Sequence, residues 1–142
     1  MGFNSENAAR IVFDIETAPL PDASDYLEPA EAPSNYKDEA KIAAYVAEKQ
    51  AEALGKCALD VDLCRVVAIG AWREGTEPWA IVNTDESGLL RAWWAIASDL
   101  HLVGFNCLAF DLPVLLRRSL YLGIPAPFVQ IEKYKHPQVT DL

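Results

Sequence analysis

Three acidic residues, Asp14, Glu16 and Asp111, have the types and positions that divalent-metal chemistry requires. Asp14 and Glu16 lie two residues apart in the stretch 10–17, which begins with β-branched and aromatic residues, as a buried strand does. Alternate side chains of a strand share a face, so these two carboxylates point the same way, roughly 7 Å apart at the backbone. Two such charges repel each other, and cations between them would offset this repulsion. Hard divalent ions take carboxylate oxygens as ligands.

Each acid also has a simpler interpretation. Glu16 could lie beyond the end of the strand, with both acids of the pair facing water, and short Asp-x-Glu matches are too frequent to carry much information. Asp111, at the start of an expected helix, could serve only as its cap. The joint occurrence of the three acids is what favours a metal site.

The expected topology brings Asp111 to the other two acids. Asp111 follows a strand expected at 101–106, and a helix separates this strand from its predecessor, so it can lie parallel to the strand at 10–17. In α/β folds, sites gather at the carboxyl ends of the strands. Three carboxylates at that edge could hold two divalent ions about 4 Å apart, which clamp the attacking and leaving oxygens of a phosphoryl transfer.

The elements around these residues follow an α/β order. They are strands at residues 10–17, 65–72, 78–83, 101–106 and 139–142, a short strand near 128–131, and helices at 86–99 and 110–123. The turn at 74–76 predicts a hairpin, and Thr84 or Asp85 is expected to cap the helix at 86–99. Trp93 and Trp94 on that helix are interpreted as packing residues in preference to a base-stacking platform. A ribonuclease-H-like arrangement fits this order, as do several other α/β folds.

Residues 18–56 are expected to form an insert between the first two strands of a single domain that spans residues 1–142. Its first part, 18–36, is rich in proline and predicts irregular loop. Its second part, 37–55, has apolar residues near helical spacing and predicts a helix that Gly55 ends. The mixed charges of this helix are typical of a solvated face.

Composition sets broad limits on the function. The 51% hydrophobic and 23% charged residues exclude wholesale disorder. The net charge of −9 argues against a basic nucleic-acid-binding surface, although bound divalent ions would reverse the local potential. No apolar run has the length of a membrane span and no signal pattern opens the sequence, so we expect a cytoplasmic protein. The cysteines form no CxxC pair and are expected to be buried reduced thiols (Cys57, Cys64 and Cys107).

Two motifs carry a family resemblance. Residues 13–17, Phe-Asp-Ile-Glu-Thr, resemble the first exonuclease motif of the DEDD superfamily, the 3′–5′ exonucleases that include polymerase proofreading domains. Residues 104–115, Gly-Phe-Asn-Cys-Leu-Ala-Phe-Asp-Leu-Pro-Val-Leu, resemble the second motif, in which an asparagine precedes Phe-Asp. The Phe-Asp-x-Pro pattern and the helical insert are most similar to predicted exonucleases related to the proofreading domain of B-family polymerases.

This resemblance implies a ribonuclease-H-like fold, with a mixed sheet of antiparallel and parallel strands and flanking helices, and two Mg²⁺ or Mn²⁺ ions. Asp14 would bridge both ions, Glu16 would bind the catalytic one, and Asp111 would hold the second, partly through water. Thr17 and Asn106 would position the nucleotide and its phosphates. The implied reaction is hydrolysis of the terminal phosphodiester at a 3′ end of DNA or RNA, releasing nucleoside 5′-monophosphates.

The sequence departs from the family at the third motif, which should supply a final aspartate and a tyrosine or histidine base. His136 and Asp141 imitate its H-x₄-D form, but Pro137 and two β-branched residues oppose the helix that this motif needs. We therefore interpret 139–142 as the strand that precedes the motif, and expect a truncated domain. Loss of a positioned base costs roughly 10²- to 10⁴-fold in rate, so this chain is expected to be weak or inactive alone.

Two other functions stay open at this point. The chain could be a non-catalytic module that binds a polymerase, a helicase or single-stranded nucleic acid, or an enzyme completed in trans by a second chain. A truncated sheet would also expose an edge and apolar surface, which makes self-association an expectation.

Overall fold

The computed structural model describes residues 8–82, 85–127 and 137–142. The short strand expected near 128–131 and His136 lie outside these residues. The chain divides into two compact units, one formed by Met1–Thr17 with Val66–Leu142 and the other by Ala18–Arg65. None of the described helices is both long and apolar enough to cross a membrane.

A mixed sheet forms the centre of the first unit, with five strands among the described residues in the order β3-β2-β1-β4-β5. Their bounds are Arg10–Pro19 for β1, Cys64–Trp72 for β2, Trp79–Val82 for β3, His101–Gly104 for β4 and Val139–Asp141 for β5. β2 and β3 pair antiparallel, whereas β4 pairs parallel to both β1 and β5. The predicted hairpin and the predicted parallel pair are therefore confirmed, although β4 ends at Gly104, two residues earlier than expected.

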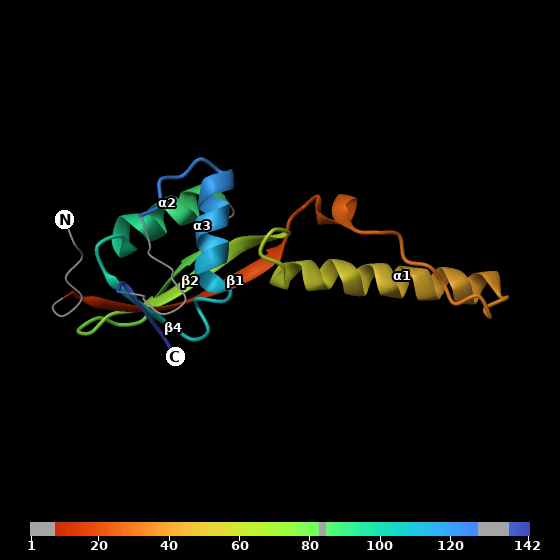
Figure 1. Cartoon of the computed structure of the whole chain (residues 1–142), viewed down its shortest axis with the longest axis horizontal. Coiled ribbons are helices and arrows are strands. Elements are labelled where there is room, and N and C mark those ends of the chain that lie inside the picture. Colours follow the sequence, from red (N-terminus) through yellow and green to blue (C-terminus); the bar gives the residue numbers. More distant parts are fainter. Residues whose placement is uncertain (1–7, 83–84, 128–136) are drawn as a thin grey trace. The chain divides into compact units, whose positions relative to one another are not determined.

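Two helices, α2 (Glu86–Ala97) and α3 (Asp111–Tyr121), lie together on one face of this sheet (Figure 1). Asp85 caps α2, since its carboxylate accepts hydrogen bonds from the amides of Ser87 and Gly88, both at 3.2 Å. The ring of Trp93 packs against Phe13 of β1, with 5.2 Å between centroids. Trp94 is buried as well and its Nε1 donates to Ser119 Oγ at 2.8 Å, so the interpretation of both tryptophans as packing residues holds.

The core follows the alternation of the strands. On β1, Ile11, Phe13 and Ile15 are buried, and each is followed by an exposed residue, as the period of two predicts. The core is completed by apolar side chains from both helices (Leu89, Leu90, Trp93, Leu112, Val114 and Leu115). β1 is thus fixed in register, because a slip by one residue would bury its acids.

A buried ion pair joins the two helices to the sheet. Arg118 of α3 donates to both carboxylate oxygens of Glu86, from Nε at 3.0 Å and from a terminal nitrogen at 2.7 Å. Glu86 Oε1 also accepts the amide of Val66 on β2 at 2.8 Å. The first residue of α2 thereby holds α3 and β2 in place together.

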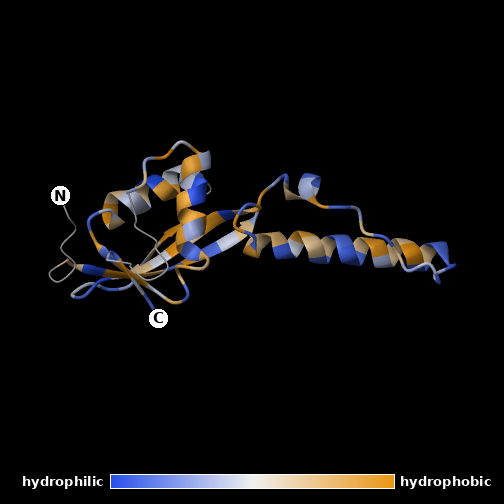
Figure 2. Cartoon of the chain, in the orientation of Figure 1, coloured by the Kyte–Doolittle hydropathy of each residue, from blue (hydrophilic) through white to orange (hydrophobic). Residues whose placement is uncertain are grey.

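The second unit contains α1 (Glu39–Lys56) and two short 3₁₀ helices, at Ala23–Tyr26 and Cys57–Leu59. The first of these corrects the expectation of irregular loop throughout 18–36. The prediction that Gly55 ends the helix is wrong, because Gly55 lacks the left-handed conformation of a C-terminal glycine and lies within α1. Every residue of α1 is described and none is fully buried, and polar and apolar residues alternate along it (Figure 2).

Candidate acidic site

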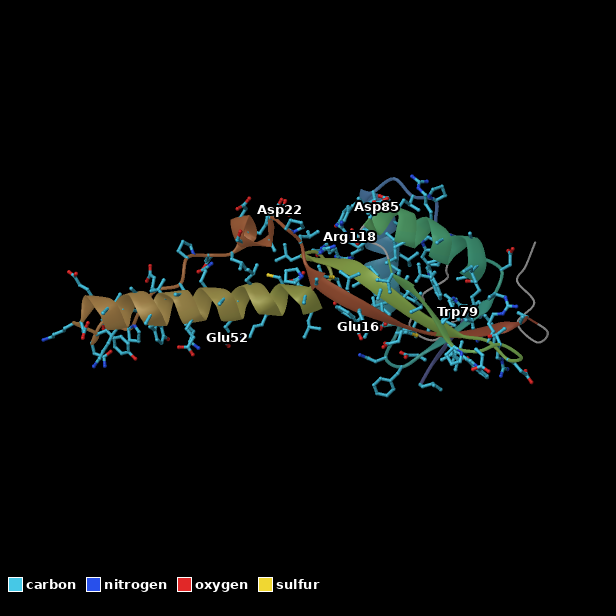
Figure 3. All side chains as sticks on the ribbon, turned by 180° about the vertical axis from the view of Figure 1, so that it is seen from behind. Glu16, Asp22, Glu52, Trp79, Asp85 and Arg118 are labelled. Carbon is cyan, nitrogen blue, oxygen red and sulfur yellow. The ribbon has the colours of Figure 1, made fainter. Side chains whose placement is uncertain are left out.

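Asp14 and Glu16 lie on the face of β1 that the two helices leave open. Both are exposed and alternate with buried Phe13 and Ile15. Figure 3 shows Glu16 on the opposite side of the β1 ribbon from Arg118 of α3. Glu16 lies within β1, which continues to Pro19, so the interpretation that placed it beyond the strand end is wrong. The part of that interpretation in which both acids face water agrees with their exposure.

Asp111 contacts β1 from the start of α3, the helix that follows the parallel neighbour β4. β1 pairs with β4 only over Arg10–Val12, so the amide of Ile15 lies beyond the paired stretch. Asp111, the first residue of α3, accepts this amide at 3.3 Å through Oδ1. Its carboxylate therefore contacts the residue between Asp14 and Glu16, and does not serve only as a cap of its own helix.

The environment of Asp111 is unfavourable for its charge. Only 7% of the residue is exposed, and burial raises the pKa of its carboxyl group above the ordinary range. The negative charges of Asp14 and Asp141 raise this pKa further, while hydrogen bonds from the amides of Asp111 itself and Ile15 act in the opposite direction. A cation beside these carboxylates would relieve both their repulsion and the cost of desolvation.

The loop between β4 and α3 has an unusual backbone. Asn106 adopts φ 50°, in the left-handed region that is uncommon for residues other than glycine. The carbonyl of Cys107 accepts the amide of Leu112 at 2.9 Å, which fixes the start of α3. At Gly104 a Cβ atom would lie 2.7 Å from Cys107 Cβ, so only glycine allows the loop to turn this closely.

The two nucleotide-positioning candidates lie near the ends of their strands. Thr17 follows Glu16 on β1 and is partly buried, whereas Asn106 is exposed on the loop after β4. Asn106 is thus accessible, and its left-handed conformation fixes the direction in which the backbone presents it.

Sequence reasoning weighed Asp141 only as an imitation of the third motif and discounted it, although the structure brings this acid beside the loop that leads to Asp111. Asp141 ends β5 in register with Gly104, and its Oδ1 accepts the amide of Cys107 at 2.8 Å. It is a strand-end acid as expected, but one that contacts the loop leading to Asp111. The available signal was the strand expected at 139–142, whose carboxyl end must arrive beside those of its parallel neighbours.

The side chains supply donors that suit a hard cation but do not form a finished metal site. Among the described residues, no three acidic, histidine or cysteine side chains are grouped closely enough to hold a metal ion. Asp14 and Glu16 are exposed to solvent, and carboxylate oxygens are the ligands that Mg²⁺ prefers. Cys107 lies beside these acids as a buried thiol, because burial, followed by the charges of Asp141 and Asp111, raises its pKa to about 12.

Comparison of the sequence with known protein families gave a match. Residues 58–138 match the model of a family described as predicted 3′-5′ exonucleases related to the exonuclease domain of PolB. The matched range includes Asn106 and Asp111, and Asp14 and Glu16 precede it. No curated protein matches the chain.

The structure resembles that of the family B DNA polymerase from the hyperthermophilic archaeon Pyrobaculum calidifontis, with a TM-score of 0.57 and 17% sequence identity. The match covers 100% of this chain and 16% of the polymerase chain. At this identity the likeness shows the fold, and the predicted ribonuclease-H-like mixed sheet is confirmed.

Proposed function

Since this chain belongs to the family of predicted 3′–5′ exonucleases related to the exonuclease domain of PolB, we propose that it acts on the 3′ end of single-stranded DNA or RNA. The reaction is hydrolysis of the terminal phosphodiester, with release of nucleoside 5′-monophosphates. The observation that supports it most is the hydrogen bond from the Ile15 amide to Asp111 Oδ1. Through this bond, Asp111 contacts the residue between Asp14 and Glu16, which is 96 positions away in the chain.

In this proposal Asp14, Glu16 and Asp111 hold two Mg²⁺ or Mn²⁺ ions, with Asp14 shared between them. Asp111 is the fixed member, because it is buried and bound to the Ile15 amide. The exposed side chains of Asp14 and Glu16 turn toward it when cations arrive, which accounts for the absence of a finished cluster among the described residues. Bound ions of this kind stabilise the charge of a phosphoryl transition state and lower the pKa of the attacking water.

Thr17 and Asn106 hold the terminal nucleotide in this proposal. The hydroxyl group of Thr17 and the amide group of Asn106 both donate hydrogen bonds suited to phosphate or sugar oxygens. Asn106 is exposed on the loop that directly precedes Asp111, so a nucleotide bound there lies beside the acids.

We further propose that the activity of these 142 residues is weak, because the described part of the first unit offers no general base beside Asp111. Its histidine, His101, lies at the start of β4 and its Nε2 is hydrogen-bonded to Thr140 Oγ1 at 2.9 Å. Its tyrosine, Tyr121, is the last residue of α3, whereas Asp111 is the first. Both therefore lie at the wrong ends of their elements to act on water beside Asp111.

A second candidate function is a non-catalytic module that binds nucleic acid or a protein. The specific observation in its favour is that the acids do not form a finished metal cluster among the described residues. In this case Asp111 serves the fold alone, through its bond to Ile15.

The two candidates are separated by incubating 5′-labelled single-stranded DNA and RNA with the chain and Mn²⁺. An exonuclease gives a ladder that shortens from the 3′ end, is lost with EDTA and is lost in Asp14→Asn. Asp99→Asn removes the same charge from an exposed turn after α2 and should leave the ladder unchanged. Equal products from wild type and D14N would contradict the catalytic proposal, and binding of the strand without cleavage would support the second candidate.

A further inference from the structure

We propose that Asp141 is a positioning residue, which fixes the loop between β4 and α3 so that Asp111 reaches β1. The inference rests on the proposed function, because its consequence for catalysis follows only if Asp111 belongs to the active site. The structural part stands on hydrogen bonds within the first unit.

Asp141 is itself held firmly. β5 runs parallel to β4 with Leu102, Val103 and Gly104 aligned to the three residues of β5. The amide of Leu142 donates to the carbonyl of Gly104 at 2.9 Å, which closes the ladder directly after Asp141. The carboxylate therefore projects from a paired strand end, from which its Oδ1 accepts the Cys107 amide at 2.8 Å.

From Cys107 the effect reaches Asp111 through consecutive hydrogen bonds. The carbonyl of Cys107 accepts the amide of Leu112 at 2.9 Å, in the first turn of α3. Asp111 precedes Leu112 and accepts the amide of Ile15. Three bonds thus connect β5 to the loop, the loop to α3, and α3 to β1. The close approach of Cys107 to Gly104 leaves the loop no room to shift toward β4.

This fixed point lies directly beside an uncommon backbone conformation. Asn106, which precedes Cys107, is in the left-handed region, which few residues other than glycine and asparagine adopt. The hydrogen bond from the Cys107 amide to Asp141 Oδ1 holds the loop in this conformation, and an uncharged oxygen at the same place can accept it as well. Without this bond, the turn can adopt other conformations and move the start of α3.

A position-based role and a charge-based role make opposite predictions for two substitutions. Asp141→Asn keeps an oxygen acceptor at the same distance and removes the charge. Asp141→Glu keeps the charge and displaces the acceptor by one methylene. If Asp141 acts by position, D141N resembles wild type and D141E resembles Asp141→Ala. If the charge is what matters, for example as a cation ligand, the order is reversed and the proposal is overturned.

Amide hydrogen exchange without divalent ions tests the structural part and needs no enzymatic activity. In D141A and D141E we expect exchange at Cys107 to accelerate about tenfold, the effect of losing the hydrogen bond that Asp141 accepts from this amide. The amide of Ile15 should accelerate as well, because its acceptor Asp111 moves with the loop. D141N and the control Asp99→Ala should leave both rates near those of wild type. Unchanged protection of Ile15 in both D141A and D141E would overturn the proposal.

The catalytic consequence is measured with Mn²⁺ and the labelled strand. D141A and D141E should lower kcat about 10- to 100-fold with little change in KM, since a small misplacement of a catalytic group acts on the reacting geometry. D141N should retain most of the rate, and a rate as low as that of D141A would overturn the positioning role. If wild type itself cleaves nothing, the proposed function fails, whereas the exchange measurement still decides the role of Asp141 in the fold.

Discussion

At the scale of single residues, Asp111 lies in surroundings that disfavour its charge. It is buried, it lies near two other acids, and it accepts only backbone amides in the described contacts. Acids in such surroundings raise the energy of a folded protein, and they are concentrated at functional sites for this reason. The same feature predicts how the stability of the chain responds to pH.

Because burial and neighbouring charges raise the pKa of folded Asp111, the folded state binds more protons than the unfolded state above the ordinary aspartate pKa of about 3.9. The contribution of Asp111 to stability therefore falls as the pH rises from that value through the folded pKa. Asp111→Asn keeps an acceptor for the Ile15 amide and removes the titrating charge. We expect D111N to unfold at a higher urea concentration than wild type at pH 7, without divalent ions, and this difference to shrink toward pH 4. A D111N protein less stable than wild type at pH 7 would contradict this assignment.

The thiol of Cys107 should be chemically inert in the folded protein. Its side chain is fully buried and its pKa is raised to about 12, so at pH 8 only on the order of one thiol in 10⁴ is ionised. We expect iodoacetamide to label Cys107 in urea and to leave it unlabelled under native conditions, as read by mass spectrometry of the peptides. Rapid native labelling would show that the loop between β4 and α3 opens.

At the scale of elements, the ion pair of Glu86 with Arg118 sets how α3 lies on the sheet. Both side chains are about 10% exposed, so neither can recover its hydration if the partner is removed. We expect Glu86→Leu to lower the free energy of unfolding by about 3 kcal/mol, measured with urea, because it leaves Arg118 buried without its carboxylate. Adding Arg118→Met should restore a large part of this loss. A change within about 0.5 kcal/mol for E86L alone, the range of ordinary surface substitutions, would contradict the assigned role.

Local signals in the sequence were sufficient for most elements. The alternation in β1 predicted which residues are buried, and Asp85 predicted the start of α2. The parallel pairing of β1 and β4 was also predictable, because the connecting helix allows it, and it carries Asp111 to β1. Gly55 misled the prediction of the end of α1, since a glycine ends a helix only when its backbone turns left-handed.

The contact of Asp141 could not be read from local sequence. Its partner Cys107 is 34 residues away, and a backbone amide leaves no trace in the residue types of either segment. The loop conformation at Asn106 was hidden for a related reason, because it depends on the space that Gly104 leaves for Cys107. The approach of Asp111 to β1 was therefore predictable, and the way in which the loop holds it there was not.

At the scale of the whole molecule, the net charge of −9 opposes binding of a polyanion. Divalent ions at the acidic site would reverse this locally, so we expect binding of a fluorescent single-stranded oligonucleotide to depend on Ca²⁺, which binds carboxylates as Mg²⁺ does. By fluorescence anisotropy, the affinity should rise at least about tenfold with Ca²⁺ in wild type and stay unchanged in the double variant Asp14→Asn, Glu16→Gln. Equal affinity in EDTA would show that the strand binds elsewhere.

The central claim is that Asp14, Glu16 and Asp111 hold divalent ions together, and substoichiometric Mn²⁺ tests it most directly. In a ¹⁵N-labelled chain, bound Mn²⁺ broadens the amide signals closest to it. We predict that the amides of Ile15 and Asp111 disappear first in wild type, and that they persist in D111N under the same conditions. Uniform weak broadening over all acidic surfaces, or the same loss in D111N, would contradict the claim.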